Sequence, residues 1–293
     1  MREPDKPKAA QSAATRPQEI SFVHTRTGPP LLLLGGLLGG SFCWRFTISA
    51  LASRYSVHAV DLPGSGMSQD IGIDCSMEQQ AKRLAGFVRQ MGWTEFSVVG
   101  SSFGGAIAML LAGQDAEIRT RICSLVLSSP VNPWSDFGRR RIHLLSSRLG
   151  GYFLRMALPI SHPVHGLALR RMYGDPARIQ EDSFAGYRAT ILQRGRAQNV
   201  LTALRHWQQD LVTMERVIPQ LRIPTLLIWG TFDKAVDPRS ATMLKERLPQ
   251  AELKLIPGAG HLPFEETPEE FNRIVLEFLT KAFPSPLQRR PAS

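Results

Sequence analysis

The sequence predicts an α/β protein, with a mostly parallel central sheet, helices on both of its faces and an inserted helical cap. Short apolar runs typical of buried strands alternate with helical patterns up to about residue 130 and again from about residue 220. Such alternation is typical of a parallel sheet whose faces are both covered. Between these parts the sequence is rich in arginine and has mostly helical patterns. We therefore predict a core formed by residues 19–130 and 220–283, and a cap, or lid, formed by residues 131–219.

Length and composition place the chain among globular proteins with a large core. It has 293 residues, of which 43% are hydrophobic and 20% charged. The longest apolar run, Leu31–Leu38, is too short to span a bilayer, and the charged first residues are not followed by a secretory signal. We expect a cytoplasmic protein without stable membrane insertion. The cysteines Cys43, Cys75 and Cys123 follow no metal-ligand spacing and are expected to be free thiols.

The net charge of +10 comes mainly from arginines that are spread along the chain. No basic stretch is interleaved with aromatic residues as in a nucleic-acid platform, so we expect no nucleic-acid partner. The run Arg139–Arg141 is interpreted as a solvated face. The alternative is that it binds an anionic head group or a carboxylate near the lid.

The first part of the chain contains a tail, two strands and a glycine-dense loop. Residues 1–18 lack periodicity and are predicted to be disordered. Ile20–Val23 alternates weakly, as an edge strand would, and Leu31–Leu34 is typical of a buried strand. The loop that follows, up to Trp44, contains four glycines. Its backbone N–H groups can point into a cavity and hold an oxyanion.

The next elements are a strand, a turn and a helix. Ser56–Val60 predicts a strand that runs into the turn-forming sequence Asp61–Gly66. Ser76 and Gln79 have the spacing of a capping box, with Ser76 as N-cap, which predicts a helix from there to about Met91.

A strand, a sharp turn and a helix follow around Ser102. The apolar run from Phe96 ends in Gly100-Ser101-Ser102-Phe103-Gly104, and Ala106–Ala112 is typical of a tightly packed helix. This context predicts a nucleophile elbow, since a serine on a strained turn needs small neighbours on both sides. Gly100 and Gly104 supply that room for Ser102, the candidate nucleophile. Ser101 is flanked by Val99 and Phe103, which are too large for it to occupy the tip.

Two aspartates follow the strand predicted at Thr225–Trp229, and they are expected to differ in role. Asp237 precedes Pro238, which is the pattern of an N-cap followed by proline at the first helical position. Asp233 lies in the loop at the end of the strand and has no comparable structural reason to be acidic.

The remaining core consists of a strand, a loop and a helix. Leu253–Ile256 predicts the last strand and is followed by Gly258-Ala259-Gly260-His261. A helix from about Pro268 to Phe283 closes the core, and residues 284–293 form a C-terminal tail.

Ser102, Asp233 and His261 each lie in a loop after a predicted strand. In a parallel sheet such loops meet at one edge, so we expect the three side chains to converge. His261 can remove the hydroxyl proton of Ser102, and Asp233 can fix the tautomer of the imidazole and stabilise its charged form. The three residues predict nucleophilic catalysis at a carbonyl group.

These motifs resemble those of the α/β-hydrolase superfamily in its capped form, over roughly Ile20 to Phe283. The resemblance rests on the sequences around Ser102, Asp233 and His261 and on the Asp61–Gly66 turn. It implies a catalytic triad of these three residues and an oxyanion hole formed by the backbone N–H groups of Leu37 and Phe103. The sequence departs from the family pattern in the glycine loop, where Gly35-Gly36 replaces the usual His-Gly.

The resemblance implies a serine hydrolase, carboxylesterase-like, which cleaves a carboxylic ester or thioester of a largely apolar small molecule through an acyl-enzyme on Ser102. Haloalkane dehalogenases and epoxide hydrolases of this fold use aspartate at the elbow, so both are disfavoured. Several alternatives stay open: a carbon–carbon bond hydrolase of diketone-type substrates, a non-catalytic ligand-binding homologue, and a cofactor-free perhydrolase or a tailoring enzyme.

The sequence also suggests which groups contact the ligand. Candidate substrate-binding residues are Gly36 in the glycine loop and Trp134, Tyr173 and Trp207 in the cap. No cofactor is expected. No metal site is expected either, because the seven histidines show no paired ligand spacing. The expected partner is a small-molecule substrate, and the oligomeric state stays open.

Overall fold

The computed structural model of the chain describes residues 21–24, 28–67, 73–136, 138–160 and 162–283. The tails predicted at residues 1–18 and 284–293 lie outside the described residues. Within those ranges, no helix is long and apolar enough to cross a membrane.

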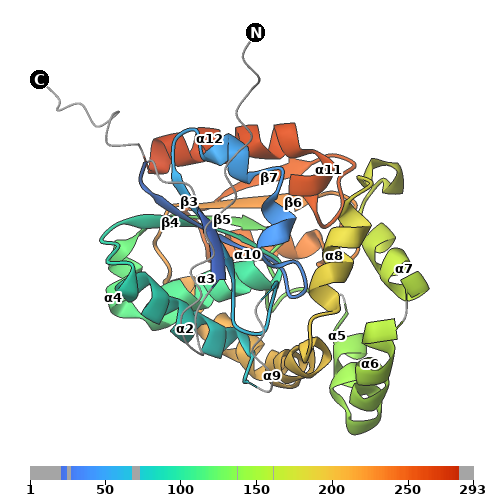
Figure 1. The fold of residues 1–293 in the computed structure, drawn as a ribbon. Helices are drawn as coiled ribbons and strands as arrows, with labels where there is room; N and C mark the ends of the chain where they lie inside the picture. The colour runs from blue at the N-terminus through green and yellow to red at the C-terminus, as the bar shows by residue number, and fades with distance from the viewer. Residues whose placement is uncertain (1–20, 25–27, 68–72, 137, 161, 284–293) are drawn as a thin grey trace, which may run out of the picture.

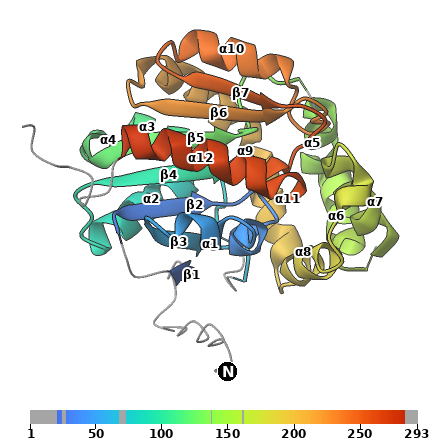
Figure 2. The same ribbon diagram turned by 90° about the horizontal axis from the view of Figure 1, so that it is seen from above.

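Seven strands form one sheet at the centre of the fold. They are β1 (Ser21–His24), β2 (Pro30–Leu34), β3 (Ser56–Asp61), β4 (Phe96–Ser101), β5 (Ile122–Ser128), β6 (Thr225–Gly230) and β7 (Glu252–Ile256). Their order in the sheet is β1-β3-β2-β4-β5-β6-β7 (Figure 2). The edge strand β1 is antiparallel to β3, and all other neighbours are parallel. The predicted fold class is therefore confirmed.

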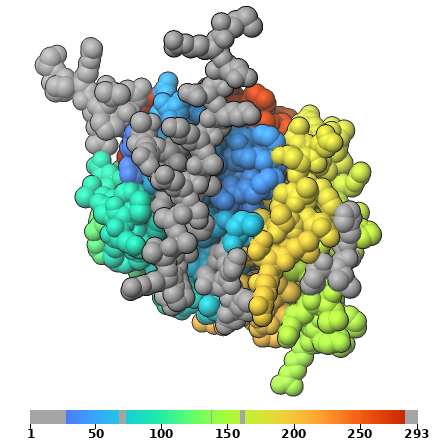
Figure 3. Space-filling model, in the orientation of Figure 1, coloured from blue at the N-terminus to red at the C-terminus, as the bar shows by residue number. Residues whose placement is uncertain are grey.

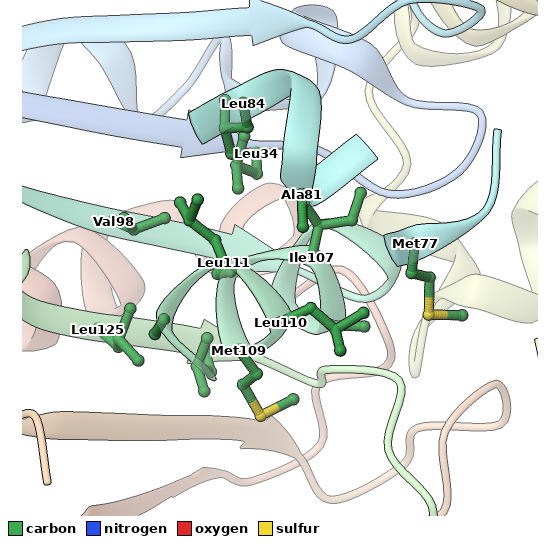
Figure 4. Packing of buried hydrophobic residues seen from close by; sticks show 14 of the residues in the cluster. Leu34, Met77, Ala81, Leu84, Val98, Ile107, Met109, Leu110, Leu111 and Leu125 are labelled. Carbon is green, nitrogen blue, oxygen red and sulfur yellow. The ribbon is translucent and has the colours of Figure 1, made fainter. Parts of the chain in front are cut away.

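Helices cover both faces of the sheet (Figure 1). The main ones are α1 (Ile48–Leu51), α2 (Met77–Gln90), α3 (Phe103–Gln114), α10 (Arg239–Arg247) and α12 (Pro268–Ala282). The alternating side chains of β2 contribute to a hydrophobic core on each face of the sheet. Leu32 and Leu34 belong to the core under α2 and α3. Leu31 and Leu33 belong to the core under α1 and α12. Burial of both faces is what a nearly continuous apolar strand requires. Figure 4 shows the first of these cores, where side chains of β2, α2 and α3 gather.

Between β5 and β6 the described residues form helices and no strand. The larger helices are α5 (Arg139–Ser146), α6 (Arg148–Ile160), α7 (His162–Met172), α8 (Ser183–Ile191) and α9 (Arg196–Val217). In both ribbon views α5 to α8 lie together at one end of the molecule, beyond the sheet (Figures 1 and 2). The short elements of the described chain are η1 (Gly40–Trp44), α4 (Ala116–Arg121), η2 (Pro176–Arg178), η3 (Ile218–Gln220) and α11 (Pro263–Glu266).

The structure confirms the predicted N-cap of α2 and moves the predicted start of α10 by one residue. Ser76 Oγ accepts a hydrogen bond from the backbone N–H of Gln79 at 3.3 Å, which confirms the N-cap of α2. Helix α10, in contrast, begins at Arg239, with Pro238 rather than Asp237 at the N-cap. The Asp237 carboxylate nevertheless accepts the N–H of Arg239 at 3.0 Å and pairs with its guanidinium group. The start of the helix is therefore displaced by one residue while the capping role of the carboxylate is retained.

Candidate active site

Ser102 lies on the turn between β4 and α3, with φ 53° and ψ −116°. This region is sterically disfavoured for a residue with a side chain, so the surrounding structure must hold it there. The N–H of Ser102 donates to the carbonyl of Ser128 in β5 at 3.0 Å. A Cβ atom at Gly100 would lie 2.8 Å from the backbone of Gly104, and one at Gly104 only 2.3 Å from the carbonyl oxygen of Leu34. Both glycines are therefore required by close packing of the backbone.

Asp233 and His261 are held together by a buried hydrogen bond. The Oδ2 atom of Asp233 lies 2.9 Å from Nδ1 of His261. The other oxygen, Oδ1, accepts the backbone N–H groups of Ala235 at 2.7 Å and Val236 at 3.0 Å. Because both carboxylate oxygens have partners and the side chain is fully buried, the carboxylate cannot turn away from the imidazole.

The loop that carries His261 is fixed from two directions. The N–H of His261 donates to the carbonyl of Met172 at the end of α7, at 2.6 Å. The N–H of Gly260 donates to Oε2 of Glu266 at 2.7 Å, and the same carboxylate accepts the N–H groups of Gly174 and Asp175. Glu266 thus ties the histidine loop to the segment that follows α7.

A cavity of about 430 Å³ lies between the sheet and the helices that follow β5. Ser102 and His261 both line it, as do Leu37 and Phe103, and Asp233 lies behind His261. Apolar side chains from both parts of the chain form most of its wall; examples are Leu38, Val131, Ile142, Leu158, Leu169, Phe184, Leu211 and Val236. The fold therefore brings the predicted triad and the glycine loop to one largely apolar space.

The glycine loop runs directly beside Ser102. A Cβ atom at Gly36 would lie 4.0 Å from Ser102 Oγ, in ordinary contact. The N–H of Phe103, the first residue of α3, has no partner within its own helix. Leu37, in the glycine loop, and Phe103 line the same cavity as Ser102.

The candidate substrate-binding residues divide into two pairs. Gly36 and Trp207 line the cavity, and Trp207 stacks on Phe103. Trp134 and Tyr173 do not line it. The Trp134 ring faces the guanidinium group of Arg247 at 4.7 Å instead. Tyr173 is fully buried.

Tyr173 belongs to a polar cluster that the sequence did not predict. Its hydroxyl donates to Glu265 at 2.7 Å, and the Tyr187 hydroxyl donates to the same carboxylate. Arg45 pairs with Glu265 at 2.8 Å, so the carboxylate is neutralised by a residue between β2 and α1 while it accepts from two tyrosines of the segment between β5 and β6. Burial and the negative charge of Glu265 raise the pKa of Tyr173, and the hydroxyl stays protonated. In the sequence, only the adjacent acidic residues Glu265 and Glu266, shortly after His261, could have indicated this cluster.

Other reactive groups near the cavity do not compete with Ser102. Cys43 also lines the cavity, but its thiol donates to the carbonyl of Gly40, and burial raises its pKa well above the usual value. It is therefore a neutral thiol rather than a thiolate nucleophile. All three cysteines are free. Within the described part of the chain, no three His, Cys, Asp or Glu side chains are grouped so that they could hold a metal ion.

The family model of the alpha/beta hydrolase fold matches residues 29–268, and the chain belongs to this family. It is 31% identical over 263 residues to a pimeloyl-[acyl-carrier protein] methyl ester esterase of Nitrosomonas europaea, covering 86% of this chain and 96% of that one. A thermophilic esterase from Thermogutta terrifontis superposes with a TM-score of 0.76 at 27% identity, over 93% of this chain and 97% of that one.

A meta-cleavage product hydrolase from Pseudomonas fluorescens shares the fold, with a TM-score of 0.75 at 22% identity, over 90% of this chain and 94% of that one. The family match and the esterase relatives support hydrolase activity for the chain.

Proposed function

We propose that the protein is a serine hydrolase that cleaves a carboxylic ester or thioester of a largely apolar small molecule. One observation carries the proposal: Ser102, on a strained turn, lines the same apolar cavity as His261, whose other ring nitrogen is hydrogen-bonded to buried Asp233. A histidine beside a serine, with a buried carboxylate on its other ring nitrogen, is the arrangement that activates a hydroxyl nucleophile. The esterase relatives support the choice of an ester.

The reaction would proceed through an acyl-enzyme. Nε2 of His261 takes the hydroxyl proton of Ser102 as Oγ attacks the carbonyl carbon, and the N–H groups of Leu37 and Phe103 stabilise the oxyanion. The tetrahedral intermediate expels the alcohol or thiol, which receives the proton from His261. A water molecule, deprotonated by His261, then attacks the acyl carbon, releases the carboxylic acid and restores Ser102.

The matched test compares the adjacent serines of the elbow. Ser101 Oγ is buried and has no hydrogen-bond partner, so Ser101→Ala removes no polar contact. We expect a fluorophosphonate probe to label the wild type and Ser101→Ala on Ser102, by mass spectrometry, and to leave Ser102→Ala unlabelled. Hydrolysis of short aryl esters should fall by roughly 10³-fold or more in Ser102→Ala.

Labelling at another residue, or equal turnover by Ser102→Ala, would refute the site. Labelling of Ser102 without turnover of any ester or thioester would refute the substrate class. The carbon–carbon bond hydrolase would then be tested with a diketone-type substrate.

A further inference from the structure

Helices α5, α6 and α7 expose a concentration of large apolar side chains. Of the thirteen exposed large hydrophobic side chains in the described residues, seven lie on these three helices, each 55 to 70% exposed. They form what we call the cap patch: Leu144, Leu149, Tyr152, Phe153, Met156, Val164 and Leu167. Exposed apolar residues are ordinary when scattered, whereas a contiguous group marks an interaction site.

Helix α6 carries the centre of the cap patch. Leu149, Tyr152, Phe153 and Met156 follow the spacing i, i+3, i+4, i+7, which places them on one face of the helix. The rings of Tyr152 and Phe153 lie 6.0 Å apart and pack on each other. In Figures 1 and 3 this light-green part of the chain projects from the lower right of the body. The segment around α6 therefore stands out from the rest of the molecule.

The charged residues of the segment that carries the cap patch have one sign. Residues 138–174 contain no aspartate or glutamate and seven arginines: Arg139, Arg140, Arg141, Arg148, Arg155, Arg170 and Arg171. Arg148 and Arg155 lie on α6 itself, next to the apolar face in the helical repeat. A projecting helix with exposed Tyr, Phe, Leu and Met side chains and flanking arginines has the composition of a helix that lies in the interface of an anionic membrane.

From these features we infer that the cap patch docks on an anionic lipid surface, with the apolar side chains of α6 entering the head-group region and the arginines facing lipid phosphates. A second copy of the chain fits less well, because an isologous dimer would bring the arginines of two copies together. A partner helix would need a groove, whereas the segment around α6 projects from the body in Figures 1 and 3. No helix of the described chain spans a membrane, so the contact is peripheral.

The cap patch is continuous with the cavity. Val164 belongs to the patch and also lines the cavity, and Ile142 and Leu158 of α5 and α6 line it from the inner side of the same helices. Docking would place the cavity beside the lipid phase, where an apolar ester is concentrated. This last step rests on the proposed esterase function, whereas docking itself does not.

The first experiment measures sedimentation of the full chain with vesicles of phosphatidylcholine alone or with about one third phosphatidylglycerol. We expect binding to the anionic vesicles and loss of binding in high salt. Tyr152→Gln/Phe153→Gln and Arg148→Ala/Arg155→Ala should each weaken binding roughly tenfold or more, since about 1 kcal/mol is expected per arginine at such a surface. Glutamine and alanine both suit an exposed helix, so folding should be retained.

The matched control is Val212→Gln/Arg216→Ala, which removes one exposed apolar residue and one exposed arginine from α9, outside the patch. It should bind vesicles like the wild type, as should Ser102→Ala. Failure of Ser102 labelling with intact vesicle binding would refute the esterase proposal alone.

Four results would overturn the docking inference. They are absence of binding to anionic vesicles, equal binding by the patch variants, a wild-type dimer in light scattering that Tyr152→Gln/Phe153→Gln dissociates, and binding of soluble polyglutamate in preference to anionic vesicles that Arg148→Ala/Arg155→Ala weakens. The third would identify a second copy as the occupant, and the fourth an acidic polypeptide.

Discussion

The two oxygens of the Asp233 carboxylate have different partners, and this division determines what its amide analogue would do. Oδ1 accepts two backbone N–H groups, while Oδ2 faces Nδ1 of His261. In Asp233→Asn the amide oxygen must take the first position, because the backbone donors cannot face an NH₂ group. The amide NH₂ group then donates to Nδ1, and the imidazole proton moves to Nε2.

Asp233→Asn should therefore lower kcat by roughly 10³-fold to 10⁴-fold, because an imidazole protonated at Nε2 cannot accept the proton of Ser102. The melting temperature should change little, since the backbone hydrogen bonds persist. Asp237→Asn is the matched control, because that carboxylate pairs with exposed Arg239 and lies outside the triad. Equal rates for the two variants in steady-state assays would show that Asp233 does not orient His261.

Gly104 offers a second test at the residue scale. A Cβ atom there would lie 2.3 Å from the Leu34 carbonyl oxygen and 2.5 Å from that of Gly35, and both obstacles are backbone atoms. Gly104→Ala should lower the free energy of unfolding by roughly 1–3 kcal/mol through overpacking and should slow phosphonate labelling. Gly86→Ala in α2, where a Cβ atom meets nothing within 4 Å, should instead stabilise by about 0.5–1 kcal/mol. Equal effects of the two changes in urea unfolding would contradict the close packing.

Among the elements, the loop before α11 depends on one carboxylate. Glu266 accepts the N–H groups of Gly260, Gly174 and Asp175 at 2.7 to 3.0 Å, from two segments far apart in the sequence. An acceptor-only group is needed there, because three donors converge on it. We therefore expect Glu266 to position His261 through the backbone.

Glu266→Gln should lower the free energy of unfolding by roughly 1–3 kcal/mol, because its NH₂ group replaces a carboxylate oxygen and leaves at least one backbone N–H without an acceptor. The rate of phosphonate labelling per folded molecule should fall as well, and kcat should fall more than KM rises. Glu270→Gln, an exposed neighbour in the first turn of α12, is the control and should match the wild type. A loss of stability with an unchanged labelling rate would limit Glu266 to a structural role.

The elements differ in how far the sequence could predict them. The strands and the turn at Ser102 were predictable because apolar runs and obligatory glycines are local signals. Trp134 and Tyr173 were assigned to the substrate site because an aromatic residue in a helical insertion gives the same pattern whether it faces a cavity or a core. Glu266 was missed because a glutamate near a helix N-terminus is an ordinary helix-dipole partner, and only the tertiary structure brings three distant N–H groups to it.

For the whole molecule, Asp210 joins the long helix α9 to the core. It is buried, and its carboxylate accepts the N–H groups of Met77 at 2.8 Å and Glu78 at 3.4 Å at the start of α2. Burial is the largest influence and raises the pKa of Asp210 to about 6, although both hydrogen bonds oppose it. The folded protein therefore holds a proton on this carboxyl group at pH values where the unfolded chain, with an aspartate pKa of about 3.9, has lost it.

This difference predicts how stability depends on pH. The contribution of Asp210 is complete below about pH 4 and is lost as the pH rises through about 6, because ionisation costs more in the folded state. Relative to Asp210→Asn, which stays neutral, the wild type should lose about 2–3 kcal/mol of unfolding free energy between pH 4 and 7. Urea unfolding at several pH values measures this difference, and Glu215→Gln, exposed on the same helix, should run parallel to the wild type. If the unfolding free energies of Asp210→Asn and the wild type depend on pH in the same way, the pKa of Asp210 is not raised in the folded protein.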